Sequence, residues 1–102
     1  MTSAVELLER LIHCANHRED ASAILHERVV LERLDGEVLR GREVVVDAVT
    51  TREGGAVLRV LSREEPDALH VALEHAEVPG HLRFVLRGVA HHGVLLAIVM
   101  EG

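Results

Sequence analysis

The stretch DGEVLRGREVVV, residues 35–46, decides between alternative folds for this chain. It places Gly36 and Gly41 between two apolar runs, VVL at residues 29–31 and VVV at residues 44–46. Three structures fit such a segment: a hairpin turn, a phosphate-binding loop, or a crossing from a strand into a helix. The choice sets how the first strand connects to the rest of the chain.

The spacing of the two glycines matches a phosphate-binding loop, but the residues that follow do not. That loop requires a lysine and then a serine or threonine, which hold the phosphates and the metal ion. Arg42 and Glu43 stand at these positions instead, and the carboxylate of Glu43 would repel a nucleotide. We therefore do not expect a phosphate loop.

The residues alone do not separate the two remaining alternatives. Valine has a high β propensity, so residues 44–46 could form a strand. Gly41 is also an acceptable helix N-cap, and an acid such as Glu43 is favourable in the first helical turn. In a helix, Val45, Ala48 and Val49 would share one face.

Upstream of this stretch, residues 3–16 are predicted to form an amphipathic helix. Ser3 and Glu6 have the spacing of a capping box. One face of the helix is apolar, with Ala4, Leu8, Leu11, Ile12 and Ala15 at helical spacing. Asp20 could cap a short second helix at residues 21–26.

The remainder of the chain has the pattern of β-strands. We expect strands at residues 29–34, 57–61, 68–77, 81–90 and 94–101. Turn signals lie at Pro79-Gly80 and His92-Gly93. Helices followed by strands predict an α+β fold, in which a curved sheet carries the helices on one face. At 102 residues the chain is expected to form a single domain, residues 1–102.

The strands on either side of residues 79–80 can be aligned if these residues form the turn. Leu73 would then lie opposite Leu86, and His75 opposite Phe84, which together with Val71 make an apolar face. On the other face, Glu74 would lie diagonal to Arg83 and Arg87. That polar face is either solvated or part of a subunit interface, where arginine is enriched.

Composition excludes several classes of partner. The net charge is −6, every basic residue is arginine, and Phe84 is the sole aromatic residue. Nucleic-acid binders carry a basic stripe and, for single strands, stacking rings, so neither a nucleic acid nor an anionic membrane is expected as a partner. The longest apolar run is too short to span a bilayer, and residues 1–11 lack a signal-peptide pattern. With Cys14 as the single cysteine, we expect a cytoplasmic protein.

The histidines and the cysteine give weak signals. His13 and His17 have metal-ligand spacing on a helix, but they lie on its polar side and lack the glutamate of a metalloprotease helix. A solvated pair is the better interpretation, and we predict no metal and no cofactor. Cys14 lies at the edge of the apolar stripe and is more simply a packed residue than a nucleophile. His75 is explained by a hydrogen-bonded core histidine, with a pocket acid or base as the minority interpretation.

The segment LHERVVLERLDGEVLRGREVVVDAV resembles the nuclear-transport-factor-two-like superfamily, in particular its SnoaL-like polyketide-cyclase and ketosteroid-isomerase branch. The order of elements matches along nearly the whole chain, and FVLRGVAHHGVLLAIVMEG is similar to the final hairpin of the family. The resemblance implies that Gly36 turns the chain and Gly41 begins a helix. It further implies a cone-shaped, mixed or antiparallel sheet with N-terminal helices on its concave face, the cystatin-like roll, and a homodimer formed through the convex sheet face.

The catalytic residues of the isomerases do not carry over to this chain. By the resemblance, their catalytic aspartate corresponds to Arg33, which cannot accept a proton. Their oxyanion-binding tyrosine has no counterpart, and their oxyanion-binding acid corresponds approximately to the apolar Val85. The cyclase branch uses a histidine and an aspartate, and no aspartate follows Asp67. Steroid isomerase chemistry is therefore not expected.

The leading hypothesis is a small apolar-pocket protein that binds a small hydrophobic molecule, with no assignable catalytic residue. Its ligand-binding residues are predicted to be Cys14, Arg33, His75 and Phe84. A first alternative is an enzyme of the cyclase, isomerase or hydrolase type, with His75 as acid or base and Arg33 stabilising an oxyanion. A second alternative is a dimerisation or regulatory module with a filled core.

Overall fold

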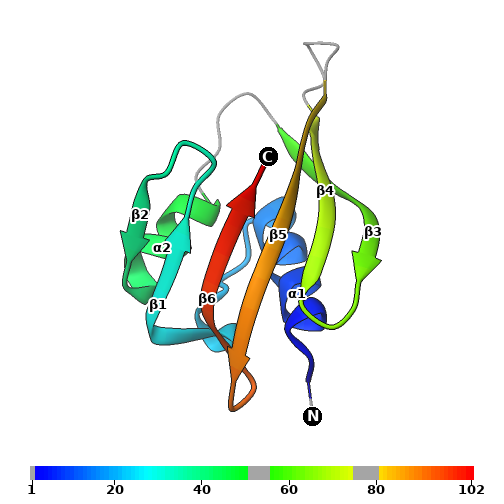
Figure 1. Ribbon diagram of the computed structural model, residues 1–102. Coiled ribbons are helices and arrows are strands. Elements are labelled where there is room, and N and C mark those ends of the chain that lie inside the picture. Colours follow the sequence, from blue (N-terminus) through cyan, green and yellow to red (C-terminus); the bar gives the residue numbers. More distant parts are fainter. Residues whose placement is uncertain (1, 51–55, 75–80) are drawn as a thin grey trace.

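The computed structural model describes residues 2–50, 56–74 and 81–102. In these residues two α-helices and a short 3₁₀ helix accompany a six-stranded sheet (Figure 1). In chain order the elements are α1 (Ala4–His17), η1 (Ser22–Ile24), β1 (Leu25–Glu32), β2 (Val38–Arg40), α2 (Arg42–Thr50), β3 (Val57–Glu64), β4 (Ala68–Glu74), β5 (His81–His91) and β6 (Val94–Glu101). The predicted α+β class, a curved mixed sheet with helices on one face, is confirmed.

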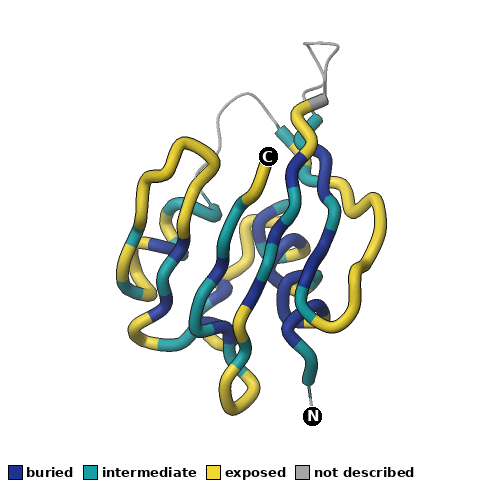
Figure 2. The backbone as a smooth tube through the Cα atoms, viewed as in Figure 1, coloured by how far each residue is buried: buried dark blue, intermediate teal, exposed yellow. Residues whose placement is uncertain are grey.

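The sheet is open and has the strand order β2-β1-β6-β5-β4-β3. Neighbouring strands are antiparallel except β1 and β6, which run parallel, with Leu31 beside Ile98. Both helices lie behind the sheet in the view of Figure 1. Buried residues concentrate in α1 and the central strands, whereas β2 and β3 at the two edges are largely exposed (Figure 2).

The stretch 35–46 combines two of the three alternatives, because Gly36 lies in the turn between β1 and β2 and Gly41 lies between β2 and α2. Gly36 has φ +88° and donates its N–H to the Arg33 carbonyl at 2.9 Å, which closes the β1–β2 hairpin turn. Gly41 has φ +99° and donates to the Val29 carbonyl at 2.9 Å. Its own carbonyl accepts the first helical bond, from the Val45 N–H at 3.0 Å. Positive φ is accessible to glycine without strain, so the chain can leave β2 and enter α2 within one residue.

The valine run at residues 44–46 is helical, against its β propensity. Val45 is fully buried beneath α2, while Val44 is 49 % exposed on its outer side. Burial of the Val45 and Val49 face against the sheet outweighs an intrinsic preference that spans only about 1 kcal/mol.

Helix α1 forms one side of the hydrophobic core. The Ser3 hydroxyl accepts from the Glu6 N–H at 3.4 Å, which is one half of the predicted capping box. The predicted apolar face is buried, together with two residues beyond it: Ala4, Val5, Leu7, Leu8, Leu11, Ile12 and Ala15. Gly88 of β5 lets the helix approach closely, since a Cβ there would lie 3.2 Å from Leu8 Cδ1.

Two local predictions were wrong. The helix expected at residues 21–26 is only the 3₁₀ turn η1, because Asp20 Oδ1 bonds Ser22 directly and β1 already begins at Leu25. The β4–β5 register is shifted by four positions from the expected one, so that Leu73 lies opposite Leu82. An even shift preserves the faces, and the apolar face is therefore as expected.

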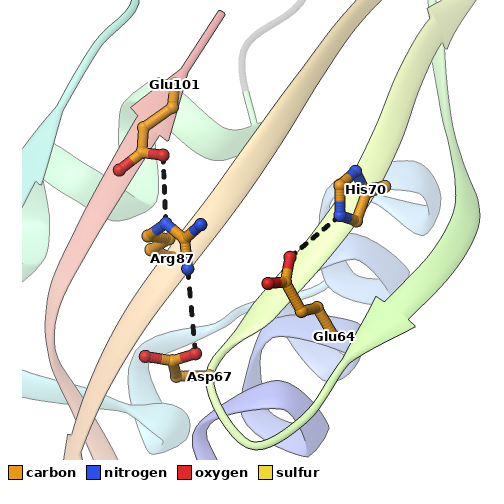
Figure 3. Close-up of polar contacts among 5 residues, drawn as sticks. All are labelled: Glu64, Asp67, His70, Arg87 and Glu101. Atoms are coloured by element: carbon orange, nitrogen blue, oxygen red, sulfur yellow. Dashed lines mark hydrogen bonds and ion pairs between the residues drawn. The ribbon is translucent and has the colours of Figure 1, made fainter.

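The register shift changes the polar pairs on the sheet face away from the helices. The Glu74 carboxylate pairs with Arg59 Nε on β3 at 2.7 Å rather than with Arg83 or Arg87. Arg87 Nε instead donates to Glu101 at 3.0 Å and its Nη1 lies 4.0 Å from Asp67, as Figure 3 shows.

We call the face of the sheet that points away from the helices the bare face. In the described ranges 2–50, 56–74 and 81–102 no helix covers it (Figure 1). It carries Val30, His70, Val85, Arg87, Val89, Ala97 and Val99, as the strand register requires. Val89 is 56 % exposed. The bare face thus has a centre of small apolar residues with ion pairs beside it.

Candidate functional site

A pocket of about 380 Å³ lies between the two helices and the sheet, and we call it the helix–sheet pocket. It takes side chains from α1, α2, the β1–β2 turn and every strand except β2. The described residues that line it are Leu11, Ile12, Ala15, Leu31, Arg33, Leu34, Asp35, Ala48, Val49, Leu58, Leu73, Leu82, Phe84, Leu86, Ile98 and Met100. Its volume falls within the range of about 300–1,000 Å³ that is usual for ligand pockets.

The wall of the pocket is apolar because the inward positions of the sheet face the apolar stripe of α1. Phe84, Leu86 and Ile98 are nearly fully buried and form its floor. Leu34 and Leu82 are 38 % and 51 % exposed, so the pocket opens to solvent where they stand.

Among the described residues that line the pocket, the polar ones are Arg33 and Asp35, and both belong to the β1–β2 turn. The turn is held by backbone bonds, including the Arg33 N–H donating to the Glu37 carbonyl at 2.8 Å. Asp35 Oδ1 accepts from the Glu37 N–H at 2.9 Å. These bonds fix the backbone that presents both side chains.

The charges of the turn are only loosely paired. Arg33 Nη1 lies 3.9 Å from Glu37 Oε1, and both side chains are at least half exposed. An exposed ion pair at this distance contributes about 0–1 kcal/mol. The Arg33 guanidinium is therefore weakly held by Glu37 and able to bind another acceptor.

The predicted site residues are distributed unevenly. Arg33 and Phe84 both line the helix–sheet pocket. His75 lies outside the described residues. Cys14 is not among the lining residues; it packs against the core and its Sγ lies 4.0 Å from the Asp20 carbonyl. The structure thus brings two of the four residues together, and their binding to a ligand stays a prediction.

Burial raises the pKa of the Cys14 thiol, and the nearby Glu19 carboxylate raises the pKa further. A raised pKa keeps the thiol protonated and lowers its reactivity as a nucleophile. In the part of the chain that the structure describes, no cluster of three or more His, Cys, Asp or Glu residues could hold a metal ion. In that same part, no helix is long and apolar enough to cross a membrane.

Sequence reasoning missed Asp35 as a pocket residue. It belongs to the stretch DGEV, which is typical of a tight turn, and its carboxylate does stabilise the turn by accepting from the Glu37 N–H. The missed signal was its place in the hairpin turn, two positions after Arg33, which also lines the pocket.

The sequence matches no family model and no curated protein. Solved structures nevertheless share its fold. A proposed ketosteroid isomerase from Kribbella flavida DSM 17836 has a TM-score of 0.80 at 19 % identity, over 96 % of this chain and 76 % of that one. A nuclear-transport-factor-two-like protein of unknown function from Mesorhizobium loti has a TM-score of 0.76 at 18 % identity, over 96 % and 88 %.

An uncharacterised cystatin-fold protein from Novosphingobium aromaticivorans has a TM-score of 0.79 at 9 % identity and is matched over the full length of both chains. The resemblance inferred from the sequence is therefore confirmed in the fold. Identities this low show the fold alone, and one fold supports many activities.

Proposed function

We propose that this protein binds a small hydrophobic molecule in the helix–sheet pocket, and we assign no catalytic residue to it. The observation that supports the proposal is the wall of the pocket, in which fourteen of the sixteen described lining residues are apolar. Burying apolar ligand surface there would contribute about 25 cal/mol per Å² removed from water.

Filling the pocket with a side chain tests this proposal. Ala48 on α2 lines the pocket, so Ala48→Phe would place a ring in the volume that a ligand would occupy. The matched control is Val44→Phe, on the outer side of the same helix. The probe is 2-methylnaphthalene, whose fluorescence is read without background because the chain has no Trp and no Tyr.

We expect the natural chain and Val44→Phe to bind the probe equally, and Ala48→Phe to bind it at least about tenfold more weakly. Equal binding by Ala48→Phe and Val44→Phe would show that the probe binds outside the helix–sheet pocket. No binding by the natural chain would argue for a filled or closed core. Native mass spectrometry of protein purified without denaturation would reveal a ligand retained from the cell.

We also propose that the protein forms a homodimer through the bare face. This face has the features of an interface, because a small apolar centre including Val85 and Val89 lies beside the Arg87–Glu101 ion pair and the His70–Glu64 hydrogen bond. A two-fold axis would set each Val89 near the same patch of the second copy.

Sedimentation at micromolar concentration tests the dimer. We expect a dimer for the natural chain, a dimer for Val44→Glu, and a monomer for Val89→Glu, because a carboxylate would be desolvated in the interface. A monomeric natural chain would contradict this proposal and leave the pocket proposal untouched.

The compartment that we propose is the cytoplasm. Cys14 is a free, half-buried thiol, and a reducing compartment maintains such thiols. Recovery of the native protein outside the cytoplasm on cell fractionation would contradict this assignment.

A further inference from the structure

We propose that the ligand of the helix–sheet pocket is a neutral amphipathic molecule, with an apolar skeleton and one hydroxyl or carboxamide group that meets Arg33 and Asp35. This inference rests on the proposed function, since it names the ligand class of the same pocket. It follows from where the polar side chains of the pocket stand and from what they can bond.

The first step is the one-sided placement of polarity. Arg33 and Asp35 stand two residues apart in the β1–β2 turn, at the end of the sheet where β1 and β6 finish side by side (Figure 1). The other described lining residues are apolar. A ligand with polar groups at both ends would leave one of them unpaired against this wall, which costs about 1–3 kcal/mol in proteins. The arrangement therefore favours one polar group on one end.

The second step is hydrogen-bonding capacity. A guanidinium has five donors, and Arg33 engages Glu37 only across 3.9 Å. A carboxylate accepts at two oxygens, and the bond from the Glu37 N–H occupies Asp35 Oδ1. The β1–β2 turn thus offers the pocket a donor and an acceptor two positions apart. A hydroxyl or a carboxamide can accept from the first and donate to the second.

The third step is charge. Arg33 and Asp35 have opposite charges, so an ionic ligand group is attracted by one and repelled by the other. A neutral group bonds both without repulsion. The polar end of the ligand is therefore expected to be uncharged.

Five naphthalenes with one skeleton test the inference on the natural chain: 2-naphthol, 2-naphthamide, 2-methylnaphthalene, 2-naphthoate and 2-naphthylmethylammonium. Their own fluorescence reports binding, since the protein contributes no Trp or Tyr signal. We expect the naphthol and the naphthamide to bind about tenfold more tightly than the methyl compound, as one or two added hydrogen bonds predict. We expect both ions to bind more weakly than the two neutral polar compounds.

Two variants of the β1–β2 turn should each bind one of the charged compounds more tightly. Misfolding cannot produce such an increase in affinity. Asp35→Asn keeps the Oδ1 acceptor and removes the negative charge, so 2-naphthoate should bind about fivefold more tightly. Arg33→Met should raise the affinity of 2-naphthylmethylammonium by a similar factor. Arg28→Met, an exposed change on β1 away from the pocket, should alter neither.

The outcomes separate the two proposals. If none of the five compounds binds, the proposed function fails and the ligand class fails with it. If 2-methylnaphthalene binds as tightly as 2-naphthol, or 2-naphthoate binds most tightly, the neutral amphipathic ligand is overturned while the apolar pocket stands. The expected order, with the two variant-specific gains, would support both.

Discussion

Asn16, near the C-terminal end of α1, pairs with the backbone of Leu58 in β3 through both ends of its side-chain amide. Nδ2 donates to the Leu58 carbonyl at 2.7 Å, and Oδ1 accepts from the Leu58 N–H at 2.9 Å. β3 is an edge strand, so at this residue the side chain of Asn16 takes the place of a neighbouring strand. The same contact fixes α1 over the pocket that Leu58 lines.

Asn16→Ala should therefore destabilise the protein by about 1–3 kcal/mol, since two partly buried backbone groups lose their partner. Arg10→Ala, on the exposed side of the same helix, is the control and should change stability by no more than about 0.5 kcal/mol. Urea unfolding measures both. Equal stability of the two variants would show that water replaces the amide without cost.

Gly88→Ala should destabilise the protein by about 1–3 kcal/mol through overpacking. The added Cβ would lie 3.1 Å from Leu95 Cδ2 and 3.2 Å from Leu8 Cδ1, and both leucines are fully buried. Leu8→Ala in the same chain should relieve the clash, so the double variant should be more stable than the sum of the single effects. Strict additivity in thermal unfolding would argue against a clash at this contact. Val44→Ala, on the exposed outer side of α2, serves as the control.

Native Cys14 should be alkylated by iodoacetamide more slowly than the same cysteine in the unfolded chain. Burial raises its pKa, followed by the effect of Glu19, so less thiolate is present at a given pH. The rate should continue to increase with pH above the ordinary thiol pKa. A native rate that exceeds the unfolded rate would instead indicate an activated nucleophile.

Asp20 should make stability depend on pH in the acid range. The Ser22 hydroxyl and then the Ser22 N–H donate to its carboxylate, at 2.6 and 2.9 Å, and lower its pKa. A lowered folded-state pKa stabilises the fold above the unfolded-state pKa, and this contribution is lost as pH falls through the folded-state pKa. The natural chain should therefore lose stability on acidification relative to Asp20→Asn, which keeps an acceptor but does not titrate. Parallel pH profiles in urea unfolding would contradict this.

Much of the fold could be predicted from local pattern. The apolar stripe of α1, the strand at residues 94–101 and the turn at His92-Gly93 follow from periodicity and turn chemistry, and the structure has all three. The valine run could not be assigned locally, because strand propensity and helix signals at Gly41 oppose each other. The family resemblance resolved it correctly in favour of a helix.

The β4–β5 register could not be predicted from the local sequence pattern. Residues 79–80 suggested a turn position, but pattern alone accepts any even shift that keeps Val71 and Leu73 on the apolar face. The pocket was only half predictable for a similar reason. Phe84 follows from the face of its strand, whereas Asp35 lies in the β1–β2 turn, where strand periodicity does not apply.

The parallel pairing of β1 with β6 has a consequence for how the chain reaches its native state. β6 is the bridge of the sheet, since on one side it holds the β1–β2 hairpin and on the other the antiparallel strands β5, β4 and β3. Its partners in β1 come from the opposite end of the sequence, and contacts of such long sequence separation form slowly. On the ribosome, the two halves of the sheet would remain unjoined until β6 emerges. Assembly of the complete sheet therefore waits for β6, although β1 is made much earlier.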